Sequence, residues 1–124
     1  MPQFTNNYNL EERTAVFSEN LIKFCKQIKE NNINKPIINQ LIRSGTSIGA
    51  NYCEANNASS RKDFQNKIFI CKKEAQETKY WLRTLSVCCP EKAEDLRKLW
   101  KETQELTMIF QKIVSSLRKV TSEN

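Results

Sequence analysis

The chain has 124 residues and a mass of 14.5 kDa, and its 20 basic and 14 acidic residues give a net charge of +6. This length suits one domain, and two glycines with three prolines are too few for an all-β fold with many tight turns. The sequence has no histidine, which excludes Ser-His-Asp and Cys-His nucleophile systems and the metal sites that need imidazole. We therefore expect no metal and no cofactor.

Apolar residues recur at helical spacing through four stretches of the chain, and polar turns separate these stretches. No internal repeat or second domain is visible. We predict an all-α fold: one four-helix-bundle domain over residues 1–124, up-down-up-down, with antiparallel neighbours. The helices are expected at residues 10–31, 36–56, 61–88 and 91–119.

Residues at the ends of these stretches support the assignment. Asn9 and Ser60 are good N-caps for the first and third helices. Pro36 and Pro90 suit the first turns of the second and fourth helices. Because the residue before a proline avoids the α region, the third helix is expected to stop before Pro90. The tail from Thr121 is expected to fray.

The second predicted helix carries small polar residues where a solvated face usually carries Lys and Glu. We expect this polar stripe, about 80° wide on a helical wheel, to meet another subunit or to join a hydrogen-bond network inside the bundle. Two glycines on the apolar side each cost a helix about 1 kcal/mol relative to alanine, which close approach of another helix would offset. The stripe comprises Arg43, Ser47, Asn51 and Glu54, and the glycines are Gly45 and Gly49.

The stretch Arg43–Ala55 resembles the signature of the four-helix-bundle proteins encoded by intervening sequences in bacterial 23S ribosomal RNA genes. Lys73–Leu82 resembles the third-helix motif of the same family. The resemblance implies a ring-shaped homo-oligomer, a pentamer. A similar bundle, the accessory variability determinant of diversity-generating retroelements, is a basic ring that binds nucleic acid and works with a reverse transcriptase. RNA or DNA and a larger nucleic acid enzyme are therefore implied partners. The motif positions carried over are Arg43, Ser47, Asn51, Glu54, Glu77 and Leu82.

The third predicted helix has an uneven charge distribution: residues 60–89 hold seven basic and three acidic groups. Four of the basic residues fall within about 40° on a helical wheel and form what we call the basic stripe: Arg61, Lys72, Lys79 and Arg83. Repeated around a ring, the stripe would make several phosphate contacts. Alternatively, it only solvates the helix or pairs across subunits. Tyr80 and Trp81 are expected to be buried in the core or an interface rather than to stack on bases.

Five cysteines without C-x-x-C spacing argue against a disulfide framework or a thiolate metal site. Three of them, Cys25, Cys53 and Cys71, fall on apolar helical positions and are expected to act as small hydrophobes, and Cys88 and Cys89 precede Pro90 in a turn. The N-terminus lacks the apolar core of a secretory signal, and no apolar run approaches the roughly 20 residues that span a bilayer. A cytoplasmic protein without membrane contact is expected.

No enzyme is expected, because the chain lacks histidine, a Gly-rich phosphate loop and a Glu-x-x-His metal motif. The leading interpretation is a nucleic-acid-associated protein that binds structured RNA or DNA through the basic surface of a homo-oligomeric ring. The alternative is an oligomeric protein-interaction scaffold whose basicity is incidental. Salt-sensitive RNA binding would separate the two.

Overall fold

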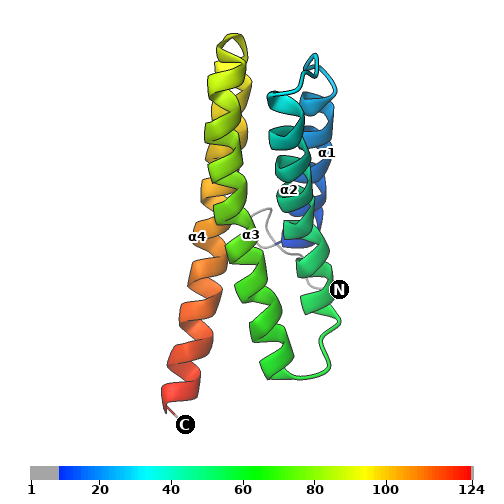
Figure 1. Ribbon diagram of the computed structural model, residues 1–124. Helices are drawn as coiled ribbons and strands as arrows, with labels where there is room; N and C mark the ends of the chain where they lie inside the picture. Colours follow the sequence, from blue (N-terminus) through cyan, green and yellow to red (C-terminus); the bar gives the residue numbers. More distant parts are fainter. Residues whose placement is uncertain (1–8, 124) are drawn as a thin grey trace.

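The structure, a computed structural model, describes residues 9–123. Four helices follow one another along the chain, and a single turn of 3-10 helix, η1 (Pro90–Lys92), precedes the last of them. Figure 1 shows two hairpins lying side by side, α1 with α2 and α3 with α4, with α2 and α3 in front and α1 and α4 behind them. The predicted all-α four-helix bundle is confirmed. The helices are α1 (Leu10–Cys25), α2 (Asn34–Asn56), α3 (Arg61–Cys88) and α4 (Ala93–Glu123).

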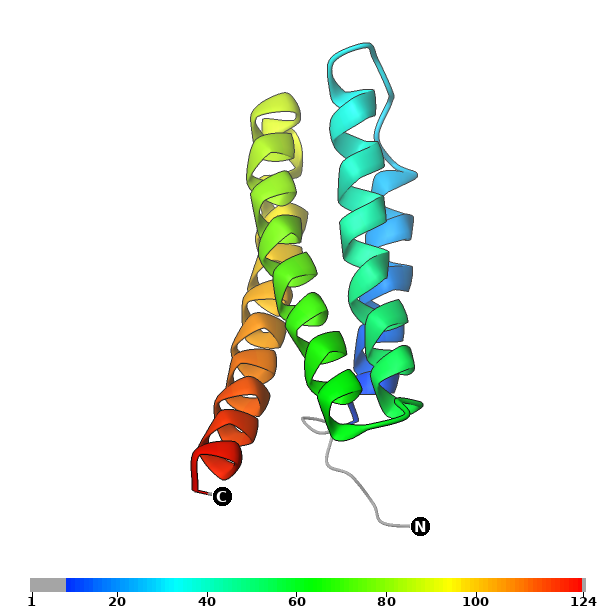
Figure 2. The same cartoon turned by 60° about the horizontal axis from the view of Figure 1, so that its bottom comes forward.

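The ion pairs between helices give their relative direction. Arg43 of α2 pairs with Glu77 of α3, whereas Glu54, further along α2, pairs with Lys67, which lies earlier on α3. The two helices are therefore antiparallel, as short turns favour. The turned view in Figure 2 shows the same alternation of direction through all four helices.

The turn between the first two helices differs from the sequence prediction. α1 ends at Cys25, six residues before the expected end at residue 31, and α2 begins at Asn34 rather than at Pro36. The reason is the side chain of Asn31, which accepts the backbone N–H groups of Ile33 and Asn34 at 2.9 and 2.8 Å. This cap starts a new helix, and Pro36 falls in its first turn, where a missing N–H costs nothing.

The other helix ends are closer to expectation. α3 has the predicted bounds, and the side chain of Ser60 accepts the backbone N–H of Asp63 at 3.0 Å. Asn9 caps α1 in the same way, through the N–H of Glu12 at 3.3 Å. α4 begins after η1 and, although we expected fraying from Thr121, its backbone continues as a helix to Glu123.

The core runs along the inside of all four helices. Within the described residues, no buried side-chain nitrogen or oxygen lacks a hydrogen-bond partner. Interior threonines satisfy their hydroxyl groups by donating to carbonyls of their own helix, as Thr103 does to Leu99 at 2.7 Å. The largest fully buried apolar side chains are Phe17, Phe110, Leu21, Ile38, Leu41, Ile48, Ile68, Leu82, Leu85, Leu106 and Val114.

The two glycines of α2 lie where α1 comes closest. A Cβ atom at Gly45 would stand 2.2 Å from Cδ2 of Leu21, and one at Gly49 would stand 3.0 Å from Oγ1 of Thr14. Both distances are shorter than an ordinary van der Waals contact. The glycines therefore allow α1 and α2 to approach each other, which offsets their low helix propensity.

Candidate nucleic-acid interface

The acidic edge of α3 is paired with α2 in the same chain. The guanidinium of Arg43 donates to Glu77 at 2.5 Å and lies 3.4 Å from the buried carboxylate of Glu74. The indole N–H of Trp81 donates to Glu77 at 3.3 Å. The hydrogen bond from Arg43 holds the pKa of Glu77 below its ordinary value, so this carboxylate is charged at neutral pH.

The rest of the polar stripe on α2 divides between two roles. Glu54 pairs with Lys67 of α3 at 2.8 Å. Ser47 donates to the carbonyl of Arg43 at 2.6 Å, and Asn51 donates to the carbonyl of Ser47 at 2.8 Å. The two ends of the stripe thus tie α2 to α3, while its centre bonds back to α2 itself.

A second group of carboxylates is paired across the seam between α1 and α4. Arg13 of α1 donates two hydrogen bonds to Glu102 of α4, at 2.7 and 2.8 Å, and a third to Glu105 at 2.9 Å. Such bidentate contacts are the stronger kind of ion pair. The hydrogen bond to Glu102 raises the pKa of Arg13, so the guanidinium is charged at neutral pH.

The basic stripe differs from these acidic groups in having no carboxylate partner. Within the described residues, none of its four members forms an ion pair. Arg61 and Arg83 are exposed, and Lys72 and Lys79 are half-buried where α3 meets α4. Lys79 donates to Gln104 of α4, and its ammonium lies 5.4 Å from the centre of the Trp100 ring. The stripe is thus positively charged and unneutralised.

Two lysines of the stripe line a groove of about 460 Å³ between the two helices, which we call the α3–α4 groove. Sequence reasoning missed its α4 wall, because the wheel of α3 alone does not show which α4 residues stand opposite. A helical wheel of α4 could have indicated this wall, because it places three polar residues on one side of the helix: Gln104, Gln111 and Lys112. The groove is lined by Lys72, Gln76, Lys79, Gln104, Thr107, Met108, Gln111 and Lys112.

The aromatic pair on α3 is less buried than the sequence indicated. Tyr80 is 59% exposed and is therefore not part of the core of the chain, so its expected burial in an interface between subunits stays a prediction. Its ring meets the edge of Trp81, with ring centres 4.9 Å apart, and Trp81 is half-buried. Trp100 of α4 is 40% exposed beneath Lys79. Trp100 therefore lies beside the basic stripe at the protein surface, whereas Tyr80 and Trp81 lie beside the acidic edge of α3.

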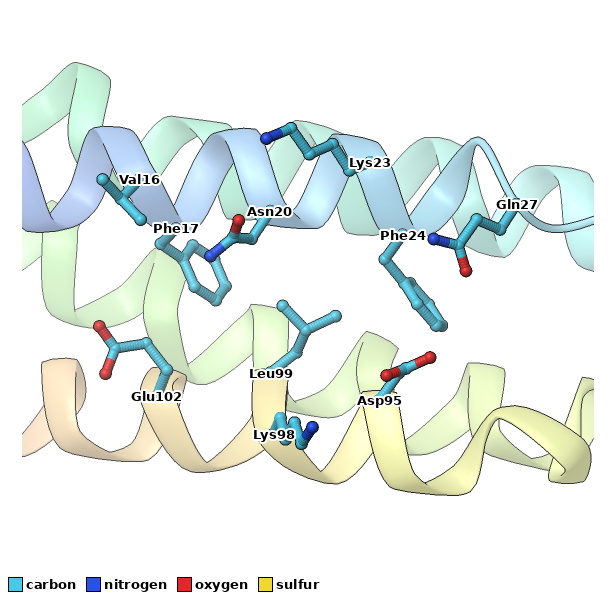
Figure 3. A pocket seen from close by; sticks show the side chains of 10 residues that line it. All are labelled: Val16, Phe17, Asn20, Lys23, Phe24, Gln27, Asp95, Lys98, Leu99 and Glu102. Atoms are coloured by element: carbon cyan, nitrogen blue, oxygen red, sulfur yellow. The ribbon is translucent and has the colours of Figure 1, made fainter.

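Two further pockets lie along the seam between α1 and α4. In the first, of about 440 Å³, Phe17 and Phe24 point from α1 toward α4, and Leu99 lies between them (Figure 3). The second, of about 700 Å³, is mostly apolar and includes the exposed Met108. The Arg13–Glu102 ion pair separates the two pockets.

The thiols offer little nucleophilic chemistry. Burial raises the pKa of Cys25 to about 11 and that of Cys71 to about 12, so both are protonated at neutral pH. Cys53 is exposed, contrary to its predicted place on an apolar face, because that side of α2 faces away from the core.

No group of three or more potential metal ligands occurs among the described residues. In residues 9–123 no helix combines the length and the apolar character that a bilayer crossing needs.

Comparison with known proteins agrees with this description. A crystal structure of a protein of unknown function from Bacteroides thetaiotaomicron, assigned to the S23 ribosomal protein family, is similar to this chain. The two share 32% sequence identity with a TM-score of 0.73, over 84% of this chain and 96% of the other. No curated protein matches the sequence. Residues 7–112 match the family described as 23S rRNA-intervening sequence protein, and the chain therefore belongs to that family.

Proposed function

We propose that this protein binds RNA or DNA without catalysing a reaction, through a basic surface presented by a homo-oligomeric ring. The observation that carries the proposal is the separation of charge around α3. Its acidic edge is paired with Arg43 inside the chain, and its basic stripe has no carboxylate partner among the described residues. Unpaired cations in a row suit a polyanion.

The charge of the whole chain supports the same function. Residues 61–124 hold 14 basic and nine acidic residues, whereas residues 1–60 hold six and five. The excess positive charge therefore belongs to the α3–α4 hairpin. A ring would repeat this surface, and several weak phosphate contacts would then add to a binding that falls steeply with salt.

The test is fluorescence anisotropy with a labelled structured RNA and a labelled duplex DNA, at roughly 50 and 200 mM salt, where phosphate-driven binding changes strongly. The whole basic stripe is changed to glutamine in one variant. We expect this variant to lose more than about tenfold in affinity at low salt, because four phosphate contacts are removed from every subunit. The substitutions are Arg61→Gln, Lys72→Gln, Lys79→Gln and Arg83→Gln.

A matched control removes the same charge elsewhere. Four exposed lysines of α1, the α1–α2 turn and the first turn of α2 are changed to glutamine, and this variant is expected to bind within about twofold to threefold of the unchanged protein. Equal losses in the two variants would contradict a localised site. Circular dichroism and light scattering check that both variants fold and assemble alike. The control substitutions are Lys23→Gln, Lys26→Gln, Lys29→Gln and Lys35→Gln.

The apolar pocket beside Met108 favours a second candidate, a protein-interaction scaffold. This pocket is open to solvent on the α1–α4 seam, and apolar surface of this kind often marks a protein contact. The scaffold predicts a partner that co-purifies with the protein and is lost in Met108→Lys but kept when the basic stripe is neutralised. Absence of nucleic acid binding at low salt, together with that result, would replace the first proposal by this one.

A further inference from the structure

We infer that the α3–α4 groove binds a single strand of RNA or DNA in preference to a duplex. This inference rests on the proposed function and narrows it to one groove and one strand state. On a structured nucleic acid, the ligand would be an unpaired loop, bulge or end.

The chemistry of the groove suits an unpaired strand. Lysines stand on both walls, with Lys72 and Lys79 on α3 and Lys112 on α4, and the lining described by the structure contains no carboxylate. Ammonium groups meet phosphates. Three glutamines, Gln76, Gln104 and Gln111, add amides that both donate and accept hydrogen bonds. The Watson–Crick edges of the bases can use such amides only when they are not paired with a complementary strand.

The shape of the basic stripe points the same way. Its members span 23 residues of α3, from Arg61 to Arg83, over a rise of about 33 Å. An extended single strand can follow a straight groove and place successive phosphates along it. The backbones of a duplex wind around their common axis, so a row of cations along one side of a helix meets each backbone only where it passes.

The ring of Trp100 stands beside the groove where an unpaired base could stack. Trp100 is 40% exposed, so its ring is accessible to a base. Lys79 is already held over Trp100 by its hydrogen bond to Gln104, so its ammonium is oriented before a ligand arrives. A groove that tracks phosphates beside stacking rings is the usual design for single-strand binding.

The first arm of the test compares two probes of the same sequence. One is a labelled 12-nucleotide RNA strand without self-complementarity, and the other is that strand annealed to its complement. At roughly 50 mM salt we expect the single strand to bind about tenfold more tightly, because only unpaired bases reach the amides and rings. Equal or tighter binding of the duplex would overturn this inference and leave the proposed function standing. Failure of both probes to bind would overturn both this inference and the proposed function.

The second arm uses two variants with the same charge change on the same helix. Lys112→Gln removes a cation from the groove, and Lys98→Gln removes one 14 residues earlier on α4, about 21 Å along the helix, where Lys98 borders the pocket between α1 and α4 (Figure 3). Each phosphate contact with a single strand adds about 0.7 to the slope of log affinity against log salt concentration. Between 1 M and 50 mM salt this contact raises the affinity roughly eightfold, and the variant that lacks it loses that gain. We expect that loss for Lys112→Gln and little change for Lys98→Gln. Similar losses of affinity in both variants would contradict the inference that the strand binds in the α3–α4 groove.

The third arm reads the groove directly through tryptophan fluorescence. Trp81 and Trp100 are the two tryptophans of the chain, and Trp81→Phe leaves Trp100 as the reporter. We expect the 12-nucleotide strand to quench this fluorescence as it binds, with the midpoint seen by anisotropy. Saturating binding that leaves the emission of Trp100 unchanged would place the strand away from the groove and contradict the inference.

Discussion

Arg43 links the sequence motif to the packing of the bundle. Its side chain leaves α2 and holds two carboxylates of α3, one of them buried. A buried carboxylate without a partner would be costly, so Arg43 and Glu74 depend on each other. The same contact removes the acidic edge of α3 from the surface charge. One residue therefore both joins two helices and leaves the basic stripe as the dominant charge on α3.

The pairing of Arg43 with Glu77 predicts a pH dependence of stability. The pKa of Glu77 is lower in the folded protein than in the unfolded chain, so the pair stabilises the fold above the unfolded pKa. That contribution is lost as the pH falls through the folded pKa. We expect the unfolding free energy of the unchanged protein to fall more steeply between about pH 5 and pH 3 than that of Glu77→Gln.

The size of this effect is modest, because the side chain of Glu77 is 35% exposed and solvent screens the pair. At pH 7 the difference between the two proteins should be at or below about 1 kcal/mol. Urea unfolding followed by circular dichroism at a series of pH values measures it. Glu19→Gln, at an exposed position of α1, serves as the matched control and should run parallel to the unchanged protein. Parallel curves for Glu77→Gln would contradict the assigned pairing.

At the scale of the helices, the sequence predicted the existence and type of each element better than its ends and faces. Apolar periodicity indicates a helix because one side must face the core. It does not show which helix stands opposite, so the α4 wall of the groove, with Gln104 and Lys112, could not be found from α3 alone. Asn31 could not be recognised as a cap, because helix formers precede it and only the turn geometry turns its side chain toward α2.

Exposure was predicted least well, and for a related reason. Cys53 and Tyr80 both belong to helices with clear apolar faces, yet both are exposed in the chain. Residues at the edge of an apolar face become buried only where a neighbour covers them, and the position of that neighbour depends on helix crossing angles. The charged residues were easier to interpret. Arg43 and Glu54 lie about 16 Å apart on one helix, which already required partners elsewhere.

The close approach of α1 and α2 predicts a cost for Gly45→Ala. The added Cβ would lie 2.2 Å from Cδ2 of Leu21, which is fully buried and cannot move aside freely. Overpacking costs about 1 to 3 kcal/mol, and alanine regains about 1 kcal/mol of helix propensity. We expect a net loss of about 1 kcal/mol in the unfolding free energy, measured by urea unfolding at fixed protein concentration.

A double-mutant cycle makes this prediction specific to the contact between the helices. Leu21→Ala alone leaves a cavity and destabilises by about 2 to 5 kcal/mol. In the double variant, the new methyl group at residue 45 enters that space, so the combined loss should be smaller than the sum of the two single losses. Additive losses, or a gain in stability for Gly45→Ala alone, would show that α1 does not approach α2 at Gly45.

On the scale of the whole molecule, four of the nine acidic residues in 61–124 pair with the α1–α2 hairpin. Glu74 and Glu77 reach α2, and Glu102 and Glu105 reach Arg13 of α1. Each of these contacts also holds the two hairpins together. The packing of the bundle and the positive charge of its α3–α4 side thus have a common origin. A surface charged in this way gains most if it is repeated, because the affinity of a single groove is limited.

The proposed ring would repeat the groove and therefore predicts a strong effect of bivalent ligands. Two 12-nucleotide strands joined by a flexible linker should bind at least about 100-fold more tightly than one strand, because the second strand binds at a high effective concentration. A single groove per particle would give only the factor of about two that comes from having two binding segments. Anisotropy titrations with a series of linker lengths measure the gain. It should be absent for linkers too short to reach a second groove, rise to a maximum, and then decline slowly with length. Light scattering on the same sample should give a mass well above the 14.5 kDa of one chain. A mass of one chain, with a gain of about two at every linker length, would refute the ring and leave a monomeric binding protein.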